Sequence, residues 1–559
     1  MKPQPSPPKA YSQIEIVRLV WLAIFVSVFS FLFYNRHGDV LLYGDAVAHI
    51  NIARRVFDSK TPGLLQLGTV WLPLPHLLIL PFIVSKQMWQ SGTGGSIPSM
   101  AAFVLGTLGI FRLVRTLLSR DEEDKTASVA AWAAAILYCA NPNLIYMQAT
   151  AMGESLYLAL FIWALVYFSE FVRCDPKASR SLTKCGFCLV GACLTRYDGW
   201  LLAAVMVIVV LIDGFRSLRS RQDQGAGLFV QYSRATLIKF ILLAASAPAL
   251  WLAYNAIVYH NPLEFANGPY SAKAIEQKTA TVNPSKGNLL AAGSYFLKAA
   301  ELSVADANWQ GRLWLALAVV GSGAAVFRTT YRPALLLWLP LPCYALSLAY
   351  GSVPIFVPAW WPFSYYNLRY GLQLLPAFAV FVPLGISLIV RFLATIPQSG
   401  VSWGRWAQAA IPFSALVLAG ASYGMIWRAD PICYREAAIN AHGRVALDGQ
   451  VAGWIQLLPS NSTLLMYLGE HVGALQQAGI PLRRVINEGN HRVWKQPADP
   501  EGLWEHALAD PVTYADYVIG FDGDPVWKAA KDRRLIELVE IHTSGQPRAV
   551  IFQGRGPAR

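Results

Sequence analysis

Four short segments of the sequence place charged side chains at the ends of long apolar runs. In chain order they are Tyr43-Gly44-Asp45-Ala46, Gly153-Glu154-Ser155, Thr195-Arg196-Tyr197-Asp198 and Asn367-Leu368-Arg369-Tyr370. The first two segments supply acids and the last two supply arginines. A carboxylate can act as a general base that takes a proton from a hydroxyl, and guanidinium forks can hold a departing phosphate. A carboxylate base together with guanidinium groups is the minimum set of side chains for a nucleophilic displacement at a carbon that is linked to phosphate.

The two acids also have a simpler interpretation as helix-terminus residues. Asp45 precedes a segment with helical periodicity, where aspartate is a preferred N-cap, and Glu154 occupies a first turn, which favours negative charge. Asp39, six residues earlier, is a rival for any role of Asp45. His49 follows four residues after Asp45, so the two side chains share a helical face. We retain Asp45 and Glu154 as candidate catalytic residues and His49 as a candidate substrate contact.

The two arginines likewise have alternative roles. Arg196 and Asp198 lie within one turn, where they could simply neutralise each other. Arg369 follows the aromatic segment 360–366, which is typical of an interfacial belt, and its guanidinium could extend to lipid headgroups. We retain Arg196, Asp198, Tyr366 and Arg369 as candidate substrate-binding residues.

The composition excludes an ordinary soluble protein. Of the 559 residues, 55% are hydrophobic and 14% are charged, whereas about a quarter of the residues are charged in a soluble globular chain. The net charge of +13 is expected on cytoplasmic loops rather than in a nucleic-acid-binding patch. Seven cysteines are too few and too scattered for a disulfide framework, and Cys185 and Cys188 lie in an apolar run that favours packing over zinc binding.

The apolar runs predict an α-helical polytopic membrane protein. A helix needs roughly 20 apolar residues to cross a bilayer, and we expect about eleven spans. They are residues 16–34, 98–118, 128–146, 155–172, 185–194, 200–212, 236–259, 313–327, 333–350, 370–390 and 409–427.

Basic residues set the expected orientation, because they collect in alternate loops. The clusters include Arg112, Arg115, Arg173, Arg180, Arg216, Arg219, Arg332, Arg391 and Arg405. If these loops are cytoplasmic, the amino terminus is inside, and residues 35–97, 260–312 and everything after Trp427 are outside. This plain pattern favours a bacterial inner (plasma) membrane, and Asp45, Glu154, Arg196 and Arg369 then share its outer face.

The first outer segment contains more than a plain loop. Residues 44–58 mix apolar side chains with two arginines, a pattern that predicts a helix lying in the membrane interface. Residues 71–89 are strongly apolar but are interrupted by Pro73, Pro75 and Pro81. They predict a second surface helix, although a twelfth span, which would invert every later assignment, is the alternative.

The composition changes after Trp427, where charged residues appear throughout. We expect a membrane module over residues 1–430 and a small α/β domain over residues 431–559. The domain should begin with an amphipathic helix at 433–458 and contain strands near Leu464, Arg483, Tyr517, 535–541 and 549–552, with helices between them. Neither a dinucleotide-binding glycine motif nor a P-loop occurs, so no nucleotide site is predicted.

At these residues the chain resembles the polytopic C-superfamily (GT-C) glycosyltransferases, which include protein O-mannosyltransferases, the lipid A aminoarabinose transferase and the catalytic subunit of oligosaccharyltransferase. The shared features are an acid after the first span, surface helices in the first outer loop, an acid before the fourth span, an arginine-tyrosine element opening a late span, and an outer carboxy-terminal domain. The resemblance implies transfer of a sugar from a polyprenyl-phosphate donor to a hydroxyl of a glycan, lipid or protein acceptor. It further implies inversion at the sugar carbon, with Asp45 as the base.

The sequence also departs from this family. Mannosyltransferases and the aminoarabinose enzyme have an Asp-Glu pair where this chain has Asp45-Ala46, and a basic residue before Pro-Pro where it has Pro73-Leu74-Pro75-His76. His76 or Arg196 could take over the phosphate contact of that basic residue. A magnesium or manganese ion is possible if Asp45 and Glu154 converge, although a single acid at each point speaks against it. A missing Trp-Trp-Asp-type motif speaks against an asparagine-glycosylating enzyme.

Two other functions fit a polytopic protein. A transporter or flippase for a polyprenyl-linked or anionic substrate is the alternative, but such proteins typically carry ionisable groups near the midplane and internal repeats. This chain has its charges at helix ends, and we find no repeat. A membrane anchor for the carboxy-terminal domain would need only one span. We therefore favour a glycosyltransferase.

Overall fold

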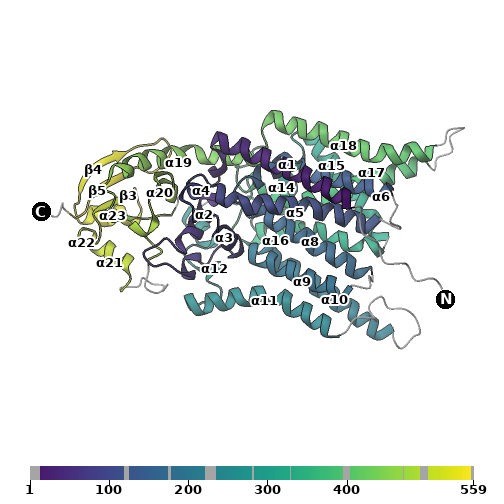
Figure 1. Cartoon of the computed structure of the whole chain (residues 1–559), viewed down its shortest axis with the longest axis horizontal. Helices are drawn as coiled ribbons and strands as arrows, with labels where there is room; N and C mark the ends of the chain where they lie inside the picture. Colours follow the sequence, from purple (N-terminus) through teal and green to yellow (C-terminus); the bar gives the residue numbers. More distant parts are fainter. Residues whose placement is uncertain are drawn as a thin grey trace.

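Long apolar runs form the long helices of a bundle. The computed structural model describes residues 13–118, 125–173, 178–220, 234–279, 283–327, 329–394, 403–469, 471–490 and 501–555. In Figure 1 the long helices run along the long axis, and a small sheet lies at the left-hand end, beyond the helices. The helices that match single predicted spans are α1 (Gln13–His37), α5 (Thr93–Leu118), α8 (Glu154–Val172), α11 (Arg234–Tyr259), α15 (Asn308–Phe327), α17 (Leu375–Ala394) and α18 (Trp403–Ala429).

The outer surface of the bundle is suited to lipid. Trp21 and Phe25 on α1 and Ile257 on α11 are 66% to 75% exposed, although each is large and apolar. Within the described ranges, seven helices are long and apolar enough to cross a membrane, or eight if one bent pair counts as a span. The polytopic helical fold with a small carboxy-terminal sheet is confirmed, whereas the count of eleven spans stays a prediction.

Several predicted spans have a different form in the structure. The run at 128–146 is not one helix but two, α6 (Lys125–Cys139) and α7 (Pro142–Gln148), bent by 62°. The Asn141 side chain caps α7 by accepting a hydrogen bond from the Leu144 N–H at 3.0 Å, and Pro142 starts the new helix. The short pair at 185–212 is longer than predicted, as α9 (Ala178–Thr195) and α10 (Asp198–Ser220). The run at 333–350 begins as η3 (Thr329–Trp338) and continues as α16 (Pro340–Tyr350).

The segment 260–312, expected only as an outer loop, contains a helix that packs into the bundle. After the short α12 (Glu264–Asn267) and α13 (Ala272–Thr279), α14 (Leu289–Val304) contacts α15, α16 and η4 (Leu368–Leu374). Its Phe296 and Ala299 are fully buried. Lys298 and Glu301 form an ion pair at 3.3 Å on this helix, and their charges masked its apolar character in the sequence.

The first long connection forms surface elements between the bundle and the sheet (Figure 1). They are η1 (Asp39–Leu41), α2 (Gly44–Arg55), η2 (Leu64–Leu67), α3 (Leu74–Ile79) and α4 (Lys86–Gln90). The helix predicted at 44–58 is α2, and most of its residues, Arg54 among them, are buried against other parts of the protein; its predicted place in the membrane interface stays a prediction. The run at 71–89 forms two helices of six and five residues, which are too short to span a bilayer and exclude the twelfth span.

The carboxy-terminal region is a three-layer α/β structure, as predicted. Its sheet has the order β2-β1-β3-β5-β4, with β1 parallel to β2 and β3, and β5 antiparallel to β3 and β4. The strands are β1 (Leu464–Met466), β2 (Val485–Ile486), β3 (Tyr517–Phe521), β4 (Ile536–Ile541) and β5 (Ala549–Gln553). The helical segments are α19 (Ile432–Leu457), α20 (Val472–Ala478), η5 (Leu482–Arg484), α21 (Leu503–Ala509), α22 (Pro511–Tyr514) and α23 (Pro525–Asp532).

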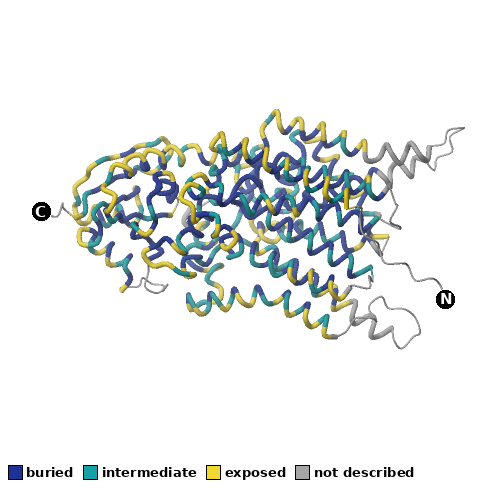
Figure 2. The backbone as a smooth tube through the Cα atoms, viewed as in Figure 1, coloured by how far each residue is buried: buried dark blue, intermediate teal, exposed yellow. Residues whose placement is uncertain are grey.

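Alternate residues of the strands serve two different cores. Val518 and Val550 face α21 and α23 in a small separate cluster, whereas Ile519 and Ile551 belong to the main core. That main core extends without a break from Leu19 in α1 to the sheet. Figure 2 shows buried residues continuing from the bundle into the sheet region.

Candidate functional site

The structure brings together charged residues that are hundreds of positions apart in the chain. Arg369, the second residue of η4, lies between three carboxylates. Its Nη2 is 2.6 Å from Asp45 Oδ2, its Nε is 3.3 Å from Glu154 Oε1, and its Nη1 is 3.2 Å from Glu436 Oε1. The candidate base, the second candidate acid and one candidate phosphate ligand therefore form one cluster.

Arg196 extends the same network. It lies in the turn between α9 and α10, where its Nη1 is 3.2 Å from Glu154 Oε1 and its Nε is 2.9 Å from Asp198 Oδ2. The Tyr344 hydroxyl accepts from Arg196 Nη2 and donates to Asp198 Oδ2, both at 2.9 Å. Arg196 and Asp198 do neutralise each other, but the shared Glu154 oxygen also joins Arg196 to Arg369.

The simpler interpretation holds for the position of Glu154 but not for that of Asp45, and both carboxylates form ion pairs. Asp45 is not the N-cap of α2, which is Tyr43, whereas Glu154 is the first residue of α8 and so occupies the predicted first turn. The carboxylates of Asp45 and Glu154 contact guanidinium groups. Arg369 is only 10% exposed, so it does not extend to headgroups. The rival Asp39 accepts from the Tyr434 hydroxyl at 3.3 Å, outside this network.

Close backbone packing fixes the elements that carry these residues. A Cβ at Gly371 in η4 would lie 2.3 Å from backbone atoms of Ala299 in α14. A Cβ at Gly95 in α5 would lie 2.5 Å from the Ala151 Cβ, three residues before Glu154, and 2.7 Å from an Ile50 side-chain carbon in α2. Larger residues at these two glycines would push the acids and the arginine apart.

Tyrosine rings surround the two guanidinium groups. The Tyr370 ring centroid is 5.0 Å from the guanidinium carbon of Arg196 and 5.2 Å from that of Arg369, and Tyr43 lies 5.1 Å from the latter. Cations are attracted to such ring faces. Tyr366 is 43% exposed and packs on Phe356, and burial raises the pKa of its hydroxyl; the negative charge of Asp45 adds to this rise, and the positive charge of Arg369 opposes it.

Exposure separates the two acids that were predicted as catalytic. The Asp45 side chain is 39% exposed, whereas those of Glu154 and Glu436 are 1% exposed. Burial raises the pKa of Glu436, against the opposing effects of Arg369 and two backbone N–H groups. Among these three acids, Asp45 is the one that a molecule arriving from solvent can reach, which suits a general base.

The two histidines form a buried pair beside the cluster. His49 Nδ1 lies 2.8 Å from His76 Nε2, and the His49 ring packs on Trp71 at 4.9 Å between centroids. Burial lowers the pKa of His49 and lowers that of His76 well below its usual value. Because a neutral imidazole supplies no positive charge, the positive charge of the cluster is that of Arg196 and Arg369.

The site does not have the geometry of a divalent-cation centre. Asp45 Oδ2 and Glu154 Oε1 both contact Arg369, so the guanidinium takes the position between the two acids that a metal ion would need. Over the described part of the chain, no three His, Cys, Asp or Glu side chains form a metal-binding group. The residues of the site therefore do not fit a magnesium or manganese ion.

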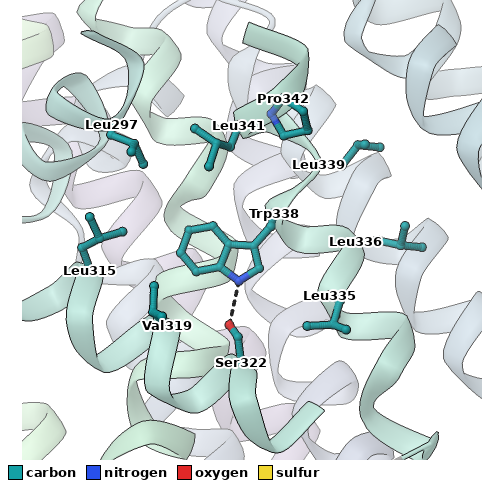
Figure 3. A pocket seen from close by; sticks show the side chains of 10 residues that line it. All are labelled: Leu297, Leu315, Val319, Ser322, Leu335, Leu336, Trp338, Leu339, Leu341 and Pro342. Carbon is teal, nitrogen blue, oxygen red and sulfur yellow. Dashed lines mark hydrogen bonds between the residues drawn. The ribbon is translucent and has the colours of Figure 1, made fainter. Parts of the chain in front are cut away.

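An apolar cavity of about 580 Å³ opens in the bundle between α14, α15, η3 and α16. Figure 3 shows Trp338 at its centre, where the indole N–H donates to Ser322 Oγ at 2.7 Å, with leucine side chains around it. Pro342 lies at the edge of the cavity on α16. Two residues later on the same helix is Tyr344, whose hydroxyl accepts a hydrogen bond from Arg196. One helix that lines the cavity thus also carries a tyrosine that hydrogen-bonds to Arg196 and Asp198.

No protein-family model and no curated protein matches this sequence, whereas several solved structures do. ArnT from Cupriavidus metallidurans in the apo state superposes with a TM-score of 0.53 at 14% identity, over 98% of this chain and 100% of that chain. This chain has the ArnT fold. ArnT bound to undecaprenyl phosphate gives 0.52 at 13% identity over the same shares. The likeness to ArnT, an aminoarabinose transferase of the GT-C group, confirms the predicted fold resemblance.

A weaker likeness links the chain to the archaeal oligosaccharyltransferase AglB from Archaeoglobus fulgidus, in complex with an inhibitory peptide and a dolichol-phosphate. Its TM-score is 0.47 at 14% identity, over 92% of this chain and 70% of that chain.

Two residues of the site were not foreseen from the sequence. Glu436 lies on α19 in the predicted carboxy-terminal domain, and Tyr344 lies within an apolar span. A glutamate in an amphipathic helix and a tyrosine in a membrane helix carry no local signal for contact with an arginine.

Proposed function

We propose that the protein is a membrane glycosyltransferase that moves a sugar from a polyprenyl-phosphate donor to an acceptor hydroxyl. The observation that carries this proposal is the single ion-pair network containing Asp45, Glu154, Arg196 and Arg369. The ArnT fold, seen in that protein with undecaprenyl phosphate bound, supports a lipid-phosphate donor. The site would face the outside of a bacterial plasma membrane, with the amino terminus in the cytoplasm.

The acceptor hydroxyl would attack the sugar C1 from the side opposite the phosphate. Asp45 takes the hydroxyl proton, the new C–O bond forms, and the bond from C1 to the phosphate oxygen breaks with its electron pair passing to that oxygen. Arg196 and Arg369 stabilise the charge that develops on the phosphate. The products are an inverted glycoside and the free polyprenyl phosphate.

The charges of the resting cluster suggest how donor binding prepares the base. The network contains Asp45, Glu154, Asp198 and Glu436 against two arginines, so a phosphate must replace a carboxylate rather than add to the cluster. Asp45 is the most exposed of the four. A phosphate that takes its place on Arg369 releases the Asp45 carboxylate to accept a proton.

The apolar cavity beside α16 is suited to the hydrocarbon chain of the carrier. Its lining is apolar apart from Ser322, whose hydroxyl is bonded to Trp338 (Figure 3). Leu341 of the lining and Tyr344 lie three residues apart on α16, and the Tyr344 hydroxyl accepts from Arg196 Nη2, so the phosphate of a chain in this cavity would lie toward Tyr344 and Arg196.

Release of undecaprenyl phosphate tests the proposal. The purified protein would be incubated with a panel of undecaprenyl-phosphate sugars and with extracts of glycan, lipid and protein acceptors, and free undecaprenyl phosphate would be measured by mass spectrometry. Turnover of one donor supports the proposal, and a product of inverted anomeric configuration supports the displacement. Flux of intact lipid-linked sugar across proteoliposomes without sugar release would instead identify a flippase.

A further inference from the structure

The Glu436 carboxylate contacts three consecutive residues at the start of η4, from the N-cap Asn367 to Arg369. Its Oε1 accepts from the Asn367 N–H at 3.1 Å and from Arg369 Nη1 at 3.2 Å, and its Oε2 accepts from the Leu368 N–H at 2.7 Å. Its side chain is 1% exposed. A buried carboxylate is stable only when such donors surround it, so the arrangement is tightly specified.

These contacts fix both the backbone and the side chain of Arg369. Asn367 adopts a left-handed conformation with φ of 56°, which turns successive N–H groups toward the carboxylate. With Glu436 on Nη1, Asp45 on Nη2 and Glu154 at Nε, each nitrogen of the guanidinium faces a different acid. Of these three, Glu436 is the one that also holds the backbone of the arginine's own segment.

The same helix also holds the segment that leads to the base. The Tyr43 hydroxyl donates to the Cys433 carbonyl at 2.9 Å, and Arg444 Nη2 donates to the carbonyls of Leu41 and Leu42 at 3.2 and 2.8 Å. Thus α19 contacts the residues before Asp45 and those before Arg369, which come from opposite ends of the membrane module. The single helix α19 therefore sets the position of Asp45 relative to Arg369.

We propose that Glu436 is a positioning residue for Arg369, through which the first helix of the carboxy-terminal domain completes the active site. The inference rests on the proposed glycosyl transfer and adds to it a role for this domain. Arg369 held by Glu436 meets the leaving phosphate in the productive orientation. A misplacement of about 1 Å can lower a rate by about 10²-fold. Loss of the Glu436 contacts should therefore lower kcat more than it lowers the affinity for the donor, because Arg196 still binds the phosphate.

Glu436→Asp tests the inference without removing the buried charge. Its carboxylate is one methylene shorter, so we expect kcat to fall about 10-fold while the KM for the undecaprenyl-phosphate sugar changes less than 3-fold. Glu436→Gln, which loses the charge, should lower kcat about 100-fold. Thermal unfolding and gel filtration would establish the folded fraction, so that kcat is expressed per folded molecule.

Asp306→Asn is the matched control. Asp306 pairs with the adjacent α19 residue Arg435 at 3.0 Å and has no contact with the Arg369 cluster, so kcat should stay within 2-fold of wild type. If wild type turns over a donor and Glu436→Asp has the same kcat per folded molecule, or if only the folded fraction falls, Glu436 has no positioning role. If wild type turns over no donor, the proposed function fails and this inference fails with it.

Discussion

Asp45→Asn is the substitution that most directly tests the proposed chemistry. It keeps the size and hydrogen-bonding shape of the side chain but removes the group that accepts the hydroxyl proton. Arg369 retains Glu154 and Glu436 as ion-pair partners, so its charge stays compensated. Because the Asp45 side chain is 39% exposed, the lost ion pair should change the free energy of unfolding by only about 1 kcal/mol.

The expected loss of activity is far larger than the loss of stability. General-base catalysis contributes about 10²- to 10⁴-fold, which corresponds to about 3 to 5.5 kcal/mol of activation free energy. We therefore expect kcat to fall by at least 100-fold. The KM for the donor should fall slightly or stay unchanged, because Asp45 no longer competes with the phosphate for Arg369.

Release of undecaprenyl phosphate from its sugar conjugate would be measured for wild type, Asp45→Asn and the control Asp39→Asn. Asp39 is six residues away and contacts Tyr434 rather than either arginine, so the same exchange there should leave kcat within about 3-fold. Binding of unsubstituted undecaprenyl phosphate would report on the phosphate site alone. Turnover by folded Asp45→Asn at the wild-type rate would refute Asp45 as the base.

Three further predictions concern the phosphate, the histidines and the apolar cavity. Arg196→Lys keeps the charge but loses the fork, so kcat/KM for the donor should fall about 10-fold or more in steady-state assays; an unchanged value would remove Arg196 from the phosphate site. Because the pKa values of His49 and His76 are lowered in the folded protein, these two side chains bind protons more readily in the unfolded chain below about pH 6.5. They therefore lower the free energy of unfolding as the pH falls, by up to about 1.4 kcal/mol per pH unit for each proton. His76→Gln should therefore lose less Tm than wild type between pH 7 and pH 5, and parallel curves would contradict this. Val319→Trp should fill the cavity and weaken binding of undecaprenyl phosphate at least 10-fold, whereas Val326→Trp, on the same helix outside the cavity, should not; equal affinities would exclude the cavity as the lipid site.

The sequence was informative where chemistry coincides with the end of an apolar run. An acid or arginine at such a place is easy to notice, because the polar residue contrasts with its neighbours and the membrane brings helix ends to one level. Asp45, Glu154, Arg196 and Arg369 were identified in this way, and their convergence is what the structure adds.

Other parts of the site give no such contrast. Glu436 follows Arg435 in an amphipathic helix, so its sequence context is that of a solvated face, although the side chain is buried. Lys298 and Glu301 lowered the apparent hydropathy of α14, because sequence patterns do not reveal that two charges pair. His49 and His76 are 27 positions apart, and the chain between them is mostly irregular. Their contact therefore cannot be predicted from a helical or strand period.

The uninterrupted core that joins the bundle to one face of the sheet has a consequence for how the protein unfolds. Ile519 and Ile551 share that core with the membrane helices, so separating the sheet would expose apolar surface to water. The sheet region should therefore melt together with the bundle in one cooperative transition rather than as an independent unit. A fragment starting at residue 431 would aggregate. Adding this fragment to the remainder of the chain would not restore glycosyl transfer.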